Sequence, residues 1–137
     1  RRAISPAISR LRPTKMGEDI SVPRSAIPEM VRRVQKIGDE FNLPIVIFGH
    51  AGDGNLHPNI LTDRRDAVEM ERVEKAIAAI FDAAVELGGT LSGEHGIGLS
   101  KQPFLGKALT PETINLMKTL KQALDPRGVL NPGKIWG

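Results

Sequence analysis

Apolar residues recur along this chain with two different periods, and the change from one period to the other predicts the order of its elements. Spacings of three and four between apolar residues predict amphipathic helices at residues 27–41, 66–87 and 110–124. Short extended runs bounded by turn residues predict strands at residues 43–48, 55–62 and 90–92. This order predicts an α+β fold, in which an antiparallel sheet carries helices on one face and a helical segment follows at the C-terminus.

Residues at the ends of these segments favour the same elements. Ser25 is a candidate N-cap for the first helix, and Pro28 falls in its first turn, where the missing N–H costs nothing. Thr110 followed by Pro111 predicts the start of the last helix. Prolines disrupt any long helix before residue 24, so this stretch is expected to be irregular apart from one strand near residues 19–22.

Length and composition limit the class of protein. A chain of 137 residues, 40% of them hydrophobic, can bury one moderate core and is expected to form a single domain. The absence of cysteine excludes a disulfide framework and a thiolate metal site, and it fits a reducing compartment. The longest apolar run, residues 43–48, is too short to span a bilayer, and the N-terminal stretch does not resemble a secretion signal. A cytoplasmic location is therefore expected, with peripheral attachment to the inner membrane as an alternative.

Basic residues are concentrated in the first third of the chain. Residues 1–36 contain nine Lys or Arg and three acids, whereas the whole chain has a formal net charge of +3. Such a segment suits an anionic partner. Tyrosine is absent and aromatic residues do not interleave the basic ones, so we expect no nucleic acid to bind. A small carboxylate substrate and a solvated basic face are the two remaining explanations.

All three histidines fall within two short polar motifs. The first runs from His50 to His57 as His-Ala-Gly-Asp-Gly-Asn-Leu-His, and the second is Gly93-Glu94-His95-Gly96. If His50 ends one strand and His57 lies early on the next, the Gly-rich loop brings their imidazoles side by side. Asn59 then lies on the same face as His57, where it can hydrogen-bond a group held by a metal. Asp53 can cap the loop or orient one imidazole.

These residue types are typical of a catalytic metal site. Two imidazole nitrogens and one carboxylate oxygen, with positions left open, form the usual ligand set of a divalent metal such as Zn²⁺ or Mn²⁺. Because Glu94 and His95 are adjacent, their side chains diverge in an extended backbone, so that one can face the metal and the other a substrate. The alternative is a hairpin whose histidines are structural. The sequence has no Gly-rich nucleotide fingerprint, so this chain is not expected to hold a nucleotide cofactor alone.

Three separated motifs give the chain a resemblance to a known family. The motifs that carry this resemblance are, in chain order, residues 49–57, 93–98 and 124–134. The family pattern is also matched by residues 19–24. Together they resemble the C-terminal cap domain of FAD-linked oxidases, a family that includes the glycolate oxidase D subunit, D-lactate dehydrogenase and D-2-hydroxyglutarate dehydrogenase, within the vanillyl-alcohol oxidase superfamily. The resemblance extends over nearly all of residues 1–137. It implies a ferredoxin-like half of a cap domain, with the FAD-binding domain outside this chain.

The resemblance also implies roles for individual residues. The implied ligands of a divalent metal, Zn²⁺ or Mn²⁺, are His50, His57 and Glu94. The implied catalytic base is His95. Substrate contacts are implied for Asn59, Arg1 and Lys15. Positions beside the flavin are implied for Glu94, His95 and Asn131.

The function that this resemblance implies is that of a flavin-dependent 2-hydroxyacid dehydrogenase or oxidase of the glycolate or D-lactate type. The chain would be its substrate- and metal-binding part and would be inactive alone. The implied partners are a small 2-hydroxyacid, the FAD-binding domain of the same protein, and other oxidase subunits or a second copy. The residues alone, without the resemblance, leave two other functional classes open. One is a self-contained metal-dependent hydrolase or lyase, and the other is a non-catalytic basic binding module.

Overall fold

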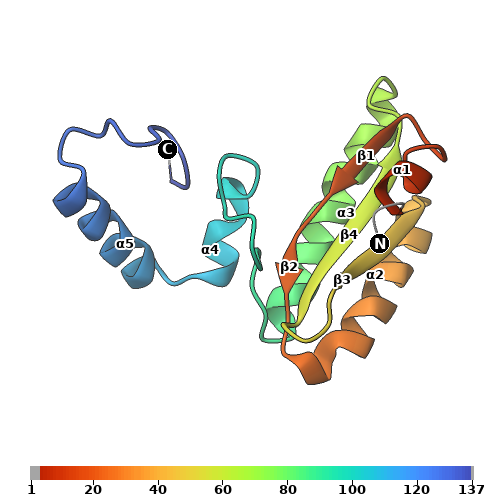
Figure 1. Ribbon diagram of the computed structural model, residues 1–137, viewed down its shortest axis with the longest axis horizontal. Coiled ribbons are helices and arrows are strands. Elements are labelled where there is room, and N and C mark those ends of the chain that lie inside the picture. Colours follow the sequence, from red (N-terminus) through yellow and green to blue (C-terminus); the bar gives the residue numbers. More distant parts are fainter. Residues whose placement is uncertain (1–3, 137) are drawn as a thin grey trace. The chain divides into compact units, whose positions relative to one another are not determined.

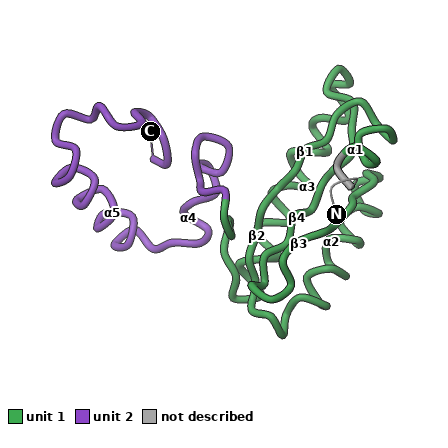
Figure 2. Tube along the Cα trace, in the orientation of Figure 1, with its two compact units in different colours: residues 1–94 green, residues 95–137 purple. Residues whose placement is uncertain are grey.

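The structure, a computed structural model, describes residues 4–136 and divides into two compact units, residues 1–94 and 95–137 (Figure 2). The residues after Glu94 make their contacts mostly among themselves.

The first unit contains the sheet and the two long helices. Its elements, in chain order, are α1 (Ile4–Ile8), β1 (Thr14–Gly17), β2 (Ile20–Ser21), η1 (Arg24–Ala26), α2 (Ile27–Phe41), β3 (Ile45–His50), β4 (Asn55–Thr62) and α3 (Ala67–Glu86). Strand β4 is central, with β3 on one side and β1 and β2 in succession on the other, all antiparallel to it (Figure 1). Thr90 adds an isolated antiparallel bridge to Ser21. The predicted α+β class is therefore confirmed.

Helices α2 and α3 pack against each other on one face of this sheet (Figure 1). The core between the helices and the sheet is made of fully or almost fully buried apolar side chains, among them Ile20, Met30, Val34, Leu56, Ile60, Val73, Ile80 and Phe81. Truncating one of the larger of these to alanine costs about 2–5 kcal/mol, since the cavity does not refill. This burial fixes which side chains of each strand face the helices.

The opposite face of the sheet carries the polar side chains. Side chains alternate between the two faces along a strand. Because Ile60 belongs to the core beneath the helices, His57 and Asn59 lie on the other face of β4. Directly opposed residues of paired strands share a face, and Phe48 is paired with His57. The candidate site residues thus lie on the face away from the helices, beside apolar side chains such as Phe48 and Leu61.

Several local expectations for the first unit differ from the structure. Residues 4–8 form the short helix α1 where irregular chain is expected, and the strand expected at residues 90–92 is reduced to the single bridge at Thr90. Residues 14–17 form β1, although the sequence predicts only irregular chain there, because their partner on β4 supplies the pairing. Ser25 does not cap α2, whose N-cap is Ala26, because a short 3₁₀ turn at residues 24–26 leads directly into the helix. Pro28 does lie in the first turn of α2, and α3 begins after the N-cap Asp66, both close to the predicted positions.

The second unit is built of η2 (Gln102–Phe104), α4 (Leu105–Ala108) and α5 (Pro111–Leu124). Helix α5 begins as predicted, with Thr110 accepting a hydrogen bond from the backbone N–H of Thr113. None of the α5 residues is buried, although their apolar spacing predicts a packed face. Within residues 4–136 we find no helix with the length and apolar character needed to cross a membrane.

Candidate metal centre

The β3–β4 hairpin places the two histidines of the first motif side by side. His50 is the last residue of β3 and His57 is the third residue of β4, with residues 51–54 forming the turn between the strands. Their ring centroids are 5.5 Å apart, and the rings are nearly perpendicular. Gly54 makes this turn possible, because its φ is +74° and a Cβ there would lie 2.0 Å from the carbonyl oxygen of Val22. The expected arrangement of the hairpin is thus present.

Glu94 reaches the same two imidazoles from a distant part of the chain. Its Oε1 lies 3.1 Å from Nε2 of His57 and 3.6 Å from Nε2 of His50. One ligand atom from each of the three residues falls within 4.8 Å of the other two. The structure therefore brings together the three residues that the sequence singles out.

The donor atoms of this cluster fit a divalent metal. Two atoms bound to one ion at about 2.1 Å, with tetrahedral or octahedral angles, lie roughly 3.0–3.4 Å apart. The distances from Glu94 to the two histidine nitrogens are close to this range. The side chain of His57 is 10% exposed, whereas those of His50 and Glu94 are 34% and 49% exposed. The cluster is thus closed on the His57 side and open on the other, as a site that also binds a substrate requires.

A polar pocket of about 340 Å³ lies beside the cluster. Its lining residues are Ser21, His50, Asp53, Asn55, Gly93 and Glu94. The Oδ1 atom of Asn55 is buried and accepts no hydrogen bond from any described residue. A buried acceptor in this state costs about 1–3 kcal/mol, which a donor on a bound ligand would recover.

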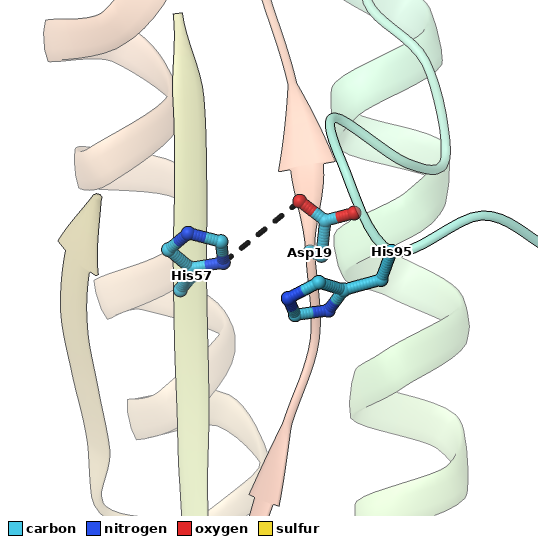
Figure 3. Close-up of side chains that lie close together, drawn as sticks. All are labelled: Asp19, His57 and His95. Atoms are coloured by element: carbon cyan, nitrogen blue, oxygen red, sulfur yellow. Dashed lines mark ion pairs between the residues drawn. The ribbon is translucent and has the colours of Figure 1, made fainter. Parts of the chain in front are cut away.

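Asp19 belongs to this site although its role is not apparent from the sequence. It is fully buried, between β1 and β2, and its carboxylate points toward the ring of His57 (Figure 3). Only the register of β4 with β1 and β2 brings it there, and register is not visible in the sequence. The available signals are that Asp19 is among the few acids of the basic first third of the chain and that it begins residues 19–24, which share in the family resemblance.

The remaining predicted residues are placed as follows. Asn59 shares the face of His57, but its side chain is buried and its amide nitrogen donates to the carbonyl oxygen of His57 at 2.6 Å, away from the pocket lining. Lys15 lies half-buried on β1. His95 and Asn131 are exposed residues of the second unit, and Arg1 lies outside the described residues. The roles suggested for these residues stay predictions.

Comparison with known proteins gives one family and several named relatives. The family of FAD linked oxidases, C-terminal domain, matches residues 1–135. Glycolate oxidase subunit GlcD of Bacillus subtilis is 53% identical over 136 residues, which are 99% of this chain and 29% of the relative. The protein of the same name from Escherichia coli K12 is 37% identical over 94% of the chain and 26% of its own length.

D-2-hydroxyglutarate dehydrogenase of Stutzerimonas stutzeri is 37% identical over 99% of this chain and 30% of its own length. The chain therefore spans less than a third of the length of each of these three relatives.

Proposed function

Because this chain belongs to the family of FAD linked oxidases, as their C-terminal domain, we propose that it is the substrate- and metal-binding part of a flavin-dependent 2-hydroxyacid dehydrogenase or oxidase. Such an enzyme converts a 2-hydroxyacid into a 2-oxoacid. The names of the relatives, which refer to glycolate and D-2-hydroxyglutarate, support this class of substrate. The observation that carries the proposal is the convergence of His50, His57 and Glu94 beside a polar pocket.

In this proposal His50, His57 and Glu94 hold a divalent metal, Zn²⁺ or Mn²⁺. When bound, the metal supplies Lewis-acid polarisation of a substrate oxygen. The carboxylate and α-hydroxyl of a 2-hydroxyacid are hard oxygen donors, which suit the open side of the cluster. Lys15 and Arg1 are proposed to pair with the substrate carboxylate, and Asn59 to support the bound acid.

His95 is the proposed base. It follows Glu94 directly in the chain, and an imidazole is suited to take up a proton near neutral pH. His95 accepts the proton of the α-hydroxyl at a ring nitrogen, and the C=O bond forms as the Cα–H bond breaks. FAD, bound mainly by a domain outside this chain with Asn131 beside it, supplies the acceptor for the hydride. Without that domain the chain is expected to be inactive, and other oxidase subunits or a second copy are further candidate partners.

The test is anaerobic reduction of the flavin in the full-length protein that contains this chain. We expect glycolate, D-lactate or D-2-hydroxyglutarate to bleach the visible absorbance of the oxidised flavin and to yield the matching 2-oxoacid. Ethanol and the L-enantiomers serve as controls that lack the carboxylate or have the opposite configuration at Cα. A purified protein that carries no flavin, or whose flavin none of the three acids reduces, would contradict the proposal and favour the hydrolase or binding-module alternatives.

A further inference from the structure

Asp19 lies beside two parts of the proposed metal centre, His57 on β4 and the loop that carries Glu94. The register pairs Gly17 with Asn59 and Ile20 with Leu56, so Asp19 stands opposite His57 across the sheet. Its side chain is fully buried. A buried carboxylate is costly unless it is well hydrogen-bonded or paired, so its contacts indicate why it is there.

One oxygen of this carboxylate holds the loop that presents Glu94. Oδ2 accepts hydrogen bonds from the Ser92 hydroxyl at 2.6 Å, the Gly93 N–H at 2.9 Å and the Glu94 N–H at 3.0 Å. Three donors from consecutive residues fix the backbone of the loop against β2. The loop also packs closely, since a Cβ on Gly93 would lie 2.6 Å from the amide of Asn55. The position of Glu94 therefore depends on Asp19.

The other oxygen of the carboxylate faces His57. Oδ1 of Asp19 lies 3.8 Å from Nδ1 of His57, while Nε2 of the same ring lies 3.1 Å from Glu94 (Figure 3). A neutral imidazole has one N–H and one lone pair. A negative oxygen beside Nδ1 favours the proton on that nitrogen, whereas the Glu94 carboxylate beside Nε2 favours it there when no metal is bound. A metal ion between Nε2 and Glu94 would take the Nε2 lone pair and leave the proton on Nδ1, the nitrogen that Asp19 faces.

We propose that Asp19 is a positioning residue for the metal centre, which acts by holding the Glu94 loop and by selecting the tautomer of His57 that can bind a metal. An amide oxygen would accept the same three hydrogen bonds, so these bonds alone do not require a buried charge. An amide has only one oxygen, however, so it could not hold the loop and also present an oxygen to Nδ1 of His57. The inference rests on the proposed metal site and goes beyond it, because Asp19 itself need not touch the metal or the substrate.

The test compares two variants that each replace a buried carboxylate by its amide in the full-length protein. Asp19→Asn keeps an oxygen for the loop donors and turns its NH₂ toward Nδ1 of His57, which moves the histidine proton to Nε2. Glu69→Gln is the matched control, since Glu69 is also buried and accepts bonds from the Thr62 hydroxyl at 2.6 Å and the Asp63 N–H at 3.2 Å, but lies outside the metal cluster.

We expect Asp19→Asn to weaken Co²⁺ binding, followed by the absorption bands of the bound ion, by about 10- to 100-fold, the usual effect of losing a residue that orients a metal-binding histidine. Glu69→Gln should bind Co²⁺ as the wild type does. A readout that needs no metal is the long-range ¹H–¹⁵N spectrum of His57 at alkaline pH. The Nδ1–H tautomer should be more populated in the wild type than in Asp19→Asn.

The outcomes separate this inference from the proposed function. Equal Co²⁺ affinity in the wild type and Asp19→Asn, or an equal loss in Asp19→Asn and Glu69→Gln, would overturn the positioning role alone. An unchanged tautomer in Asp19→Asn would overturn the selection step. A wild-type protein that binds no Co²⁺ would refute the metal site together with this inference, whereas reduction of its flavin by a 2-hydroxyacid would still support the oxidoreductase.

Discussion

The two histidines of the hairpin are held to different degrees. The ring of His57 lies 5.7 Å from that of Phe48 and 5.5 Å from that of His50, and its side chain is mostly buried. His50 ends its strand, is more exposed, and contacts Glu94 at the longer distance of 3.6 Å. A ligand that is already fixed loses little conformational freedom when it binds an ion. His57 is therefore the anchor of the proposed centre, and His50 the ligand that adjusts.

A comparison of two histidine variants tests whether His57 is a metal ligand and His95 the base. His57→Ala should lower the metal content of the purified full-length protein at least ~10-fold, since losing a ligand costs no less than losing a residue that orients one. His95→Asn should keep the metal, yet reduce the rate of flavin reduction by about 10²- to 10⁴-fold, the usual contribution of a positioned base. Elemental analysis and stopped-flow absorbance measure the two effects. If His95→Asn loses the metal and His57→Ala retains it, the two roles must be exchanged.

At the level of elements, Asp125 closes the turn that follows α5. Its carboxylate accepts hydrogen bonds from Lys121 Nζ at 2.6 Å, the Leu130 N–H at 2.9 Å and the Val129 N–H at 3.0 Å. The Lys121 hydrogen bond, and after it that from Leu130, lowers the pKa of Asp125 below its ordinary value of 3.8. The charged form of Asp125 thus organises the segment that leads to Asn131.

The lowered pKa of Asp125 predicts how this turn responds to acid. A carboxyl group whose pKa is lower in the folded state stabilises that state above its unfolded pKa of 3.8, and this contribution disappears as the pH falls through the folded-state pKa. We therefore expect the amide signals of Val129 and Leu130 to move in an acid titration with a midpoint below 3.8. Asp125→Asn should remove this transition.

Asp63 provides the control for this titration. Arg65 lowers the pKa of Asp63 to about 2, but Asp63 belongs to the first unit. Asp63→Asn should therefore leave the signals of Val129 and Leu130 unchanged. A titration of these amides that persists in Asp125→Asn would show that another group organises the turn.

The sequence predicts those elements that are determined by the pattern of their own residues, and not those that depend on a distant partner. Helices α2, α3 and α5 follow from apolar spacing, and their observed bounds differ little from the predicted ones. Strand β1 has no such pattern and exists because β4 pairs with it. The hairpin of His50 and His57 is predictable because both ligands lie in one short motif. Asp19 is not, because its role depends on the strand register and on a loop that begins 73 residues later in the chain.

At the level of the whole molecule, all three candidate ligands belong to the first unit. Two of them lie on the sheet and the third on the loop that Asp19 holds. A metal ion bound there would connect β3, β4 and this loop by direct bonds. Binding to the folded state alone adds about 2.7 kcal/mol to its stability when the free ion is at 100 times its Kd.

Hydrogen exchange of the full-length protein with and without Zn²⁺ measures this effect locally. We expect slower exchange in residues 45–62 and 90–94 when the ion is present, because opening of these segments then requires its release. Residues 111–124 of α5 serve as an internal reference and should change much less. Protection that is equal in α5 and in the sheet, or that persists in His57→Ala, would place the ion elsewhere.

The hydrogen bond between the Glu94 N–H and Asp19 joins residues 75 positions apart in the chain, and this separation sets the order in which the ligands of the proposed metal would come together. A hairpin forms within microseconds from local contacts, so β3 and β4 can present two imidazoles early. The third ligand arrives only after β2 has joined β4 and the chain has returned past α3, which carries the entropic cost of long-range closure. An incompletely folded copy would therefore release the proposed ion to a competing chelator more readily than a fully folded one. Retention of the proposed ion would thus report that this long-range closure has taken place.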